Sequence, residues 1–291
     1  MATQATAVKP AWWQGKQLRD RATKGLAFVI LFVGSLSYMA PLAWMLSTAL
    51  KSNEQLYQIP SPWIPDPVMW ENFAKAVNTF PFWLFFRNSL ITSVIPVIGV
   101  LFSSTLCGYA FARIEWPGRD IMFMIVLATM MLPFYITFIP TYVIWARFGL
   151  TNTFLPLVVP SFFGGAWNIF LIRQFFRSIP KDLSDAATID GCSHFETLWR
   201  IMVPLAKPAL ATIGVFTFMN HWNDLFAPVI YLSRKELYTL QIGLTYFMSE
   251  HRTDWQLLMA ASLLVLLPSI VIFFLGQKYF VQGITLTGIK G

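Results

Sequence analysis

Long apolar stretches, separated by short polar segments, recur along the whole chain. A helix that crosses a membrane needs roughly 20 mostly apolar residues. Six stretches reach this length, at about 25–50, 88–111, 121–142, 153–172, 209–231 and 257–276. They lack the period-two alternation of barrel strands, and in lipid a helix satisfies its own backbone hydrogen bonds. We therefore predict an all-α integral membrane protein with six transmembrane helices.

Proline occurs in every predicted span. A proline removes one backbone hydrogen bond and kinks a helix, although membrane helices tolerate single prolines. The prolines are Pro41, Pro96, Pro133, Pro140, Pro156, Pro160, Pro228 and Pro268. Their recurrence favours helices that bend or line a cavity. In the fourth stretch, Gly164 and Gly165 have two interpretations, close helix packing or a partly unwound helix beside a pathway.

The composition fits a membrane protein. Of the 291 residues, 56% are hydrophobic and only 12% are charged, and the mean hydropathy is +0.57. Soluble domains carry about twice this charged fraction, and disordered chains are far less apolar. The composition therefore excludes a soluble domain and a disordered chain.

Lysine and arginine are distributed unevenly between the two sides that six spans define. One side comprises the leader 1–24, the loops after the second and fourth spans, and the residues after the sixth span, 277–291, which include the tail 281–291; it contains 14 of the 21 basic residues. Basic residues concentrate on the cytoplasmic side, so we predict that both termini are cytoplasmic and that 25–280 forms the transmembrane domain. This asymmetry accounts for the net charge of +7 without a nucleic-acid partner.

The motifs of enzymes and metal sites are missing from the sequence. It contains no G-x-x-x-x-G-K-[ST] phosphate loop, no H-E-x-x-H pair and no nucleophile elbow. Its three histidines, His194, His221 and His251, lie in three separate segments. We therefore expect no catalytic residue, no metal and no cofactor bound by this chain.

One acidic residue, Asp224, falls inside a predicted span, in "HWNDLFAP" beside His221. Ionisable groups within spans mark ion and proton pathways. Asp224 therefore raises the alternative of a self-sufficient, ion-coupled secondary transporter. The sequence offers no chain of partners for a proton relay, however, and a membrane scaffold that moves no solute is a third alternative.

A polar segment on the cytoplasmic side, at about 176–207, predicts two short helices with a tight turn between them. Ser178 is a candidate N-cap for the first helix, with Pro180 in its first turn. Gly191 suits the left-handed residue that follows a helix end.

The second helix of this segment begins at Ser193 and Glu196, which match the S-x-x-E capping box. We predict that it ends before Pro204.

Small residues dominate the middle of the first helix, which we expect to present Ala186, Ala187 and Ile189 to the cytoplasm. Such a surface allows the groove of another protein to approach closely. The alternative is a helix that rests on the bilayer, but its acidic residues would then face an anionic leaflet.

The stretch "DAATIDGCSHFETLWRIMVP" resembles the EAA loop of ABC-importer permeases, a pattern of E-A-A, then D-G, then L-P. Asp185 stands at the glutamate position, and the matching residues that follow are Ala186, Ala187, Asp190, Gly191 and Pro204. Two departures are Asp185 itself, whose side chain is shorter, and Val203 at the leucine position. Further similar stretches are "NSLITS", "GYAFAR", "GLTNT", "HWNDLFAP" and the terminal "VQGITLTGIKG", which looks like that of MalG-like sugar permeases.

This resemblance implies the type I ABC-importer permease fold, in which the EAA helix is a coupling helix seated in the cleft of a separate ATPase. It implies two ATP-binding subunits that carry ATP and Mg²⁺, a companion permease, and an extracytoplasmic solute-binding protein. It also implies a location in the plasma membrane of a bacterium or archaeon. By the same resemblance, the residues of the C-terminal tail that reach toward the ATPases are Gln282, Gly283, Gly288 and Lys290.

The solute of such a permease is a sugar or a similar polyol. Aromatic faces and amides suit a hydroxylated ligand, and the candidate contacts are Trp167, Asn168, Asn220, Asn223 and Asp224. Polar packing between helices is an equally good interpretation of each of them. Oligosaccharides, monosaccharides and glycerol phosphates all remain open as solutes.

Overall fold

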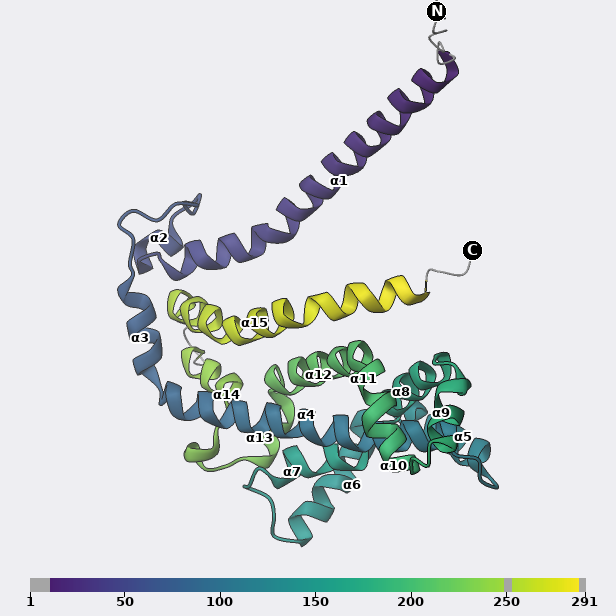
Figure 1. Ribbon diagram of the computed structural model, residues 1–291. Coiled ribbons are helices and arrows are strands. Elements are labelled where there is room, and N and C mark those ends of the chain that lie inside the picture. The colour runs from purple at the N-terminus through teal and green to yellow at the C-terminus, as the bar shows by residue number, and fades with distance from the viewer. Residues whose placement is uncertain (1–10, 249–252, 288–291) are drawn as a thin grey trace, which may run out of the picture.

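The computed structural model describes residues 11–248 and 253–287 (Figure 1). Apart from one isolated bridge between Met248 and Thr253, the regular structure of these residues is helical. The three longest helices are α1 (Ala11–Ala49), α4 (Phe82–Arg113) and α15 (Trp255–Thr287). Helices of intermediate length are α3 (Glu71–Thr79), α5 (Arg119–Ala128), α6 (Phe134–Arg147), α8 (Ala166–Ser178), α9 (Lys181–Ile189) and α12 (Lys207–Trp222).

The remaining elements are short. The short α-helices are α2 (Asn53–Tyr57), α7 (Leu155–Val158), α10 (His194–Thr197), α11 (Val203–Leu205), α13 (Phe226–Tyr231) and α14 (Leu240–Leu244). Four 3-10 turns are η1 (Thr129–Met131), η2 (Val159–Phe163), η4 (Lys235–Leu237) and η5 (Thr245–Phe247). A single π-helical turn, η3, covers Leu198–Met202.

Within the described residues, four helical segments are long and apolar enough to cross a membrane. They are Arg19–Ala49, Phe82–Arg113, Leu155–Ser178 and Trp255–Tyr279. The number rises to six if each of two strongly bent pairs counts as one span. The all-helical membrane fold is therefore confirmed, and the six predicted spans agree with the upper number.

Three predicted spans are not continuous helices. The fourth, predicted over 153–172, is interrupted at Gly164 and Gly165, between η2 and α8. The third, predicted over 121–142, bends by 97° between Arg119–Met131 and Phe134–Arg147. Pro133 has an extended backbone at the bend and caps α6 without donating a hydrogen bond. The fifth, predicted over 209–231, ends as α12 at Trp222 and resumes as α13 at Phe226.

Helix α4 lies at the centre of the fold. It packs against α8 on one side and α12 on another, while α15 packs against α12 and α1. At Gly108 of α4 the backbone lies so near α8 that an added Cβ would stand 2.6 Å from Cγ2 of Ile172. A cluster of buried hydrophobic side chains, which includes Phe85, Trp222 and Ala260, joins α4, α12 and α15.

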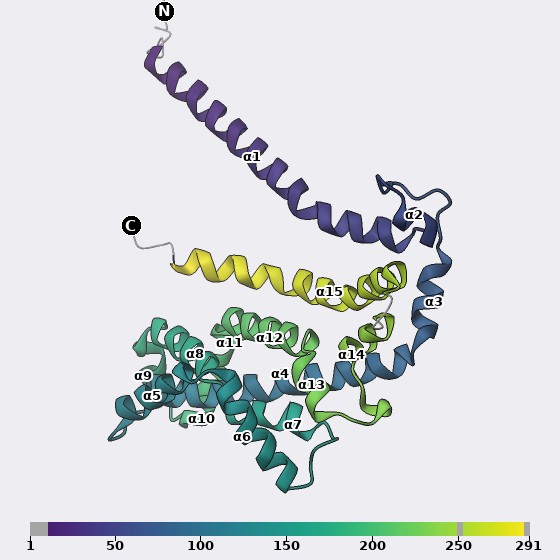
Figure 2. The same ribbon diagram turned by 180° about the vertical axis from the view of Figure 1, so that it is seen from behind.

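The first helix contrasts with this core. No residue in the most apolar stretch of Arg19–Ala49 is buried by the rest of the chain, and Figures 1 and 2 show α1 leaning away from the other helices. It begins at Ala11, inside the predicted leader 1–24, of which 1–10 lie outside the described residues.

The two ends of the helical bundle carry different segments. In both views α2, α3 and α14 lie at one end, and α9 and α10 lie at the other (Figures 1 and 2). The C-terminal end of α15 points toward the end that carries α9.

The close approach of α4 and α8 predicts that Gly108→Val destabilises the chain. The new side chain would clash with Ile172, and overpacking of this kind costs about 1–3 kcal/mol. Thermal unfolding of the detergent-purified chain should show a lower midpoint. The matched control is Gly25→Val on α1, where an added Cβ meets no atom within 4 Å. Equal midpoints for the two variants would contradict the prediction.

Candidate coupling loop and solute cavity

The first helix of the loop 176–207 starts later than its sequence predicts. Helix α9 begins at Lys181 with Pro180 as its N-cap residue. Ser178 is instead the last residue of α8, and its hydroxyl donates to the carbonyl of Phe175 at 2.7 Å. The predicted N-cap at Ser178 is therefore wrong. Ile179 precedes a proline and so takes an extended backbone, which separates the two helices.

The end of α9 has the predicted geometry. Gly191 has a φ of +80°, in the left-handed region. Its N–H donates to the carbonyl of Thr188 at 3.1 Å, and the N–H of Cys192 donates to that of Ala187 at 2.9 Å. These two bonds form a Schellman motif, so the left-handed Gly191 is confirmed. An added Cβ would meet no atom within 4 Å, which means that the backbone conformation alone favours glycine here.

The capping box that starts α10 is also confirmed. The N–H of Glu196 donates to the Ser193 hydroxyl at 3.3 Å, and the N–H of Ser193 donates to the Glu196 carboxylate at 3.0 Å. The carboxylate of Glu196 accepts hydrogen bonds from the N–H and from the hydroxyl of Ser193, and these two bonds, followed by the nearby Arg200, lower its pKa. The capping box is therefore intact at every pH above the ordinary pKa of a glutamate. It weakens only when the pH falls through the lowered pKa of Glu196.

The prediction that the second helix ends before Pro204 is wrong. The π-turn η3 follows α10, with the N–H of Val203 donating to the carbonyl of Leu198. Pro204 then stands at the start of α11, which runs to Leu205. In the first turn of a new helix the missing N–H of proline has no intrahelical partner to lose. The helical path therefore bends past Pro204 toward α12, at an angle of 79°.

The loop exposes most of the residues that match the EAA pattern. Asp185, Ala186, Asp190, Gly191 and Pro204 are all exposed. The expectation that Ala187 is exposed is wrong, because its side chain is only 4% exposed. It lies on the inner face of α9 together with Ser184, whose hydroxyl contacts the sulfur of Met202 at 4.0 Å.

Two large apolar side chains complete the exposed surface of the loop. Ile189 of α9 is 87% exposed, and Phe195 of α10 is 64% exposed. Phe195 stands edge-on to Trp199, with 6.0 Å between the ring centroids. Exposed apolar side chains next to a small-residue helix are typical of a protein-docking surface.

Two side chains of α4 fasten this loop to the core. The guanidinium of Arg113 donates to the carbonyl of Phe176 at 2.7 Å and also to that of Ile179, at the end of α8. One turn earlier, the hydroxyl of Tyr109 lies 3.5 Å from Nδ1 of His194 at the start of α10. One helix face therefore holds both sides of the loop. Neither residue was predicted to have this role, although their spacing of four residues along a helix predicts a shared face.

A cavity of about 200 Å³ lies where several helices are interrupted. Phe134 and Phe138 come from α6, directly after the 97° bend, and His221 and Asp224 flank the break between α12 and α13. The other lining residues are Thr92, Pro156, Leu157, Pro160, Ser161, Ala227, Pro228 and Tyr231.

Of the five predicted solute contacts, only Asp224 lines this cavity. Asn223 is exposed, and its amide donates to the carbonyl of Met219 at 2.8 Å. Trp167 is 55% exposed and stacks on Phe170. Asn168 is half-buried and Asn220 is exposed. The solute contacts of all five residues stay predictions.

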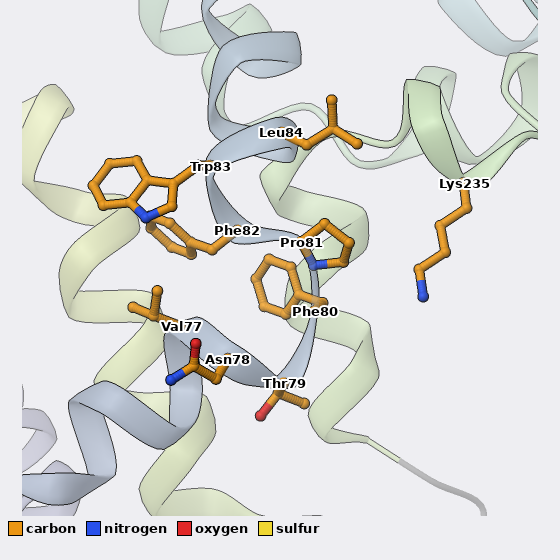
Figure 3. Close-up of a pocket in the computed structure, with 9 residues that line it drawn as sticks. All are labelled: Val77, Asn78, Thr79, Phe80, Pro81, Phe82, Trp83, Leu84 and Lys235. Carbon is orange, nitrogen blue, oxygen red and sulfur yellow. The ribbon is translucent and has the colours of Figure 1, made fainter.

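A second, more open cavity of about 490 Å³ lies at the end of the bundle opposite the loop. Figure 3 shows it at the corner between α3 and α4, around Phe80 and Pro81, with Lys235 extending alongside. The remaining lining residues are Val77, Asn78, Thr79, Phe82, Trp83 and Leu84.

The predicted C-terminal contacts are placed only in part. Helix α15 continues to Thr287, so the backbone of Gln282 and Gly283 is helical instead of forming a separate tail. Gly288 and Lys290 lie outside the described residues.

Comparison with known proteins gives consistent matches over most of the chain. The family described as "Binding-protein-dependent transport system inner membrane component" matches residues 104–286. A probable ABC transporter permease, YurM of Bacillus subtilis, is 33% identical and covers 91% of this chain and 88% of its own length. The arabinooligosaccharides transport system permease AraQ of the same species is 33% identical over 88% of this chain and 92% of its own.

A further relative and one solved structure extend these matches. The sn-glycerol-3-phosphate transport system permease UgpE of Yersinia pestis is 31% identical over 88% of this chain and 94% of its own. A chain of a bacterial ABC transporter that imports the acidic polysaccharide alginate has a TM-score of 0.78 at 24% identity, covering 94% of this chain and 100% of that one. The likeness to the alginate transporter chain is one of fold.

The contacts of Arg113 predict that Arg113→Gln loosens the loop. Hydrogen bonds from a charged donor are worth about 1.5–3 kcal/mol each, so amide hydrogen exchange over 179–197 should become roughly 10- to 100-fold faster. Mass spectrometry of the detergent-purified chain measures this rate. The control is Arg177→Gln, which removes an exposed arginine from the end of α8, the helix end that Arg113 contacts. Unchanged exchange in the Arg113 variant would show that this contact does not hold the loop.

Proposed function

The chain belongs to the family of binding-protein-dependent transport system inner membrane components, and from this membership we propose that it forms one half of the solute pathway of an ATP-driven importer. In this proposal the chain itself catalyses no reaction. ATP and Mg²⁺ are bound by two separate ATP-binding subunits, and this chain converts their movement into a change of access across the membrane.

The observation that carries the proposal is the construction of the loop 176–207. Its helices are held in place by the Schellman motif at Gly191 and the capping box at Ser193. It is fastened to a spanning helix through Arg113, yet it exposes Ala186 and Ile189. A rigid, exposed projection of this kind transmits a push, whereas a flexible loop absorbs one. We infer that α9 is the coupling helix that sits in a cleft of an ATP-binding subunit.

Within this surface, we assign separate roles to the residues of the EAA pattern. Asp185, Ala186 and Asp190 face the ATP-binding subunit, because their side chains are exposed. Gly191 fixes the turn, and Ala187 packs inside the loop. The exposed Pro204 bends the chain toward α12.

The proposal includes a companion permease. Helix α1 has an apolar surface that the described chain does not cover, and helix association in a bilayer relies on close packing between neighbours. A second permease subunit that packs against this chain would complete the pathway. We also propose that Gln282, Gly283, Gly288 and Lys290 extend toward the ATP-binding subunits, since α15 runs toward the end of the bundle that carries α9.

For the solute we propose a sugar or a similar polyol, delivered by an extracytoplasmic binding protein. The names of the relatives support this class, because they include permeases for arabino-oligosaccharides and for sn-glycerol 3-phosphate. The open cavity around Phe80 (Figure 3) lies at the end where such a binding protein would arrive.

The proposed location is the plasma membrane of a bacterium or archaeon, with both termini and the loop 176–207 in the cytoplasm. The count of basic residues supports this orientation. The family membership argues against the alternative of a self-sufficient secondary transporter that uses Asp224, because its members work with a binding protein.

This function predicts that Ala186→Glu uncouples the importer. Ala186 is exposed on α9, and a longer charged side chain there would keep the cleft of the ATP-binding subunit from closing on the helix. In proteoliposomes that contain the complete complex, we expect uptake stimulated by the binding protein to fall more than about tenfold, a loss of roughly 1.4 kcal/mol or more in coupling. Assembly, measured by co-purification of the subunits, should persist.

Ala22→Glu on α1 is the matched control, because it places the same charge on another exposed alanine, in the leader 1–24 and outside the loop 176–207. If uptake by the Ala186→Glu complex equals that of the control, α9 is not the coupling helix.

A further inference from the structure

The cavity at Asp224 lies at a level where the spans lose their regular helical structure. Phe134 follows the bend of the third span, and Ser161 belongs to the 3-10 turn that precedes the left-handed Gly164 of the fourth. Asp224 lies in the break of the fifth. Irregular backbone inside a membrane protein is tolerated where it lines a cavity or is buried in protein, and interrupted helices frame the solute sites of transporters.

Aromatic rings form much of the wall of this cavity. The ring centroids of Phe138 and Tyr231 lie 5.5 Å apart, and that of Phe134 lies 5.5 Å from that of Phe138. Flat aromatic faces suit the C–H faces of a sugar ring, since they give apolar contact without requiring hydrogen bonds. The volume of about 200 Å³ suits one ring at a time.

The charge of the cavity is one-sided. Among the described residues that line it, Asp224 is the one carboxylate, and neither lysine nor arginine is present. The remaining polar side chains are those of Thr92, Ser161, His221 and Tyr231. A carboxylate accepts strong, charge-assisted hydrogen bonds from hydroxyl groups. Away from bulk water, it also repels an anionic group more strongly than it would in solution.

The position of the carboxylate is fixed by the local backbone. Oδ1 of Asp224 accepts the N–H of Ala227 at 3.2 Å, in the first turn of α13. Asparagine caps a helix start as well as aspartate does. Asp224→Asn therefore removes the charge and keeps the cap, whereas Asp224→Ala removes both.

We propose that this cavity binds an uncharged, polyhydroxylated solute and that Asp224 is the specificity-determining residue that rejects anionic solutes. The inference rests on the proposed function and narrows it, because it favours a neutral saccharide over a phosphorylated polyol or a uronate. Hydroxyl groups of the solute donate to the carboxylate, while its ring packs on Phe138 and Tyr231.

The first experiment measures the electrostatic effect of the Asp224 charge inside the cavity, in the absence of any solute or partner subunit. A Ser161→Cys substitution is made in a chain whose two native cysteines, Cys107 and Cys192, are replaced by serine. The new thiol is treated with two methanethiosulfonates of similar size, the cationic trimethylammonioethyl and the anionic sulfonatoethyl reagent. Each rate is divided by the rate of the same reagent with free cysteine.

We expect the cationic reagent to react about tenfold faster than the anionic one, because one fixed charge nearby favours the first and opposes the second. Asp224→Asn should bring the ratio to about one. The control Asp182→Asn, which removes an exposed acid from α9, should leave the ratio unchanged. A ratio that Asp224→Asn does not alter would overturn the role of Asp224, and would leave the proposed importer function intact.

The second experiment tests occupancy by solute, using the same thiol in the complete complex. D-galactose and D-glucose are compared with D-galacturonate and D-glucuronate as agents that protect the thiol from an uncharged methanethiosulfonate. In the chain with Asp224, we expect the neutral sugars to protect the thiol and the uronates to protect it at least about tenfold less well. In the Asp224→Asn chain, sugars and uronates should protect the thiol to the same extent. Equal protection by sugars and uronates, or protection by neither, would overturn the proposal, whereas uptake assays report separately on the importer function.

Discussion

The contact between α4 and α8 is the one on which the other features of this chain depend. Gly108 lets the two backbones meet, and Arg113 and Arg173 bridge the C-terminal halves of the two helices. Arg113 binds carbonyl groups of α8, and Arg173 of α8 donates in turn to the carbonyl of Phe111 of α4 at 3.2 Å. Because α8 leads directly into α9, this exchange of hydrogen bonds positions the loop 176–207.

The same helix α4 connects the loop to the cavity. Thr92 contributes to the cavity wall, and Tyr109 contacts the loop 17 residues later, a distance of roughly 25 Å along a helix that rises 1.5 Å per residue. Pro96 lies between them and removes one hydrogen bond from the helix. The loop and the cavity are therefore joined by one continuous helix that lacks one backbone hydrogen bond between them.

The sequence predicts those parts of the site that depend on neighbouring residues alone. The left-handed Gly191 and the capping box of Ser193 and Glu196 follow local rules and are confirmed. The failures arise where tertiary packing decides. Ala187 has the same chemistry as Ala186 but faces inward. No periodicity within the third span reveals that it turns through 97° at Pro133, because the neighbours that stabilise the bend come from distant segments.

Helix α1 has a length that links the chain to the thickness of its bilayer. Arg19–Ala49 contains 31 residues, about 46 Å of helix at 1.5 Å per residue, whereas the hydrocarbon core is only about 30 Å thick. The helix must tilt, bend or protrude to reconcile the two lengths. Since the rest of the described chain buries none of the most apolar stretch of α1, the lipid composition itself sets part of the tilt of this helix. A thicker membrane would draw it closer to the bilayer normal.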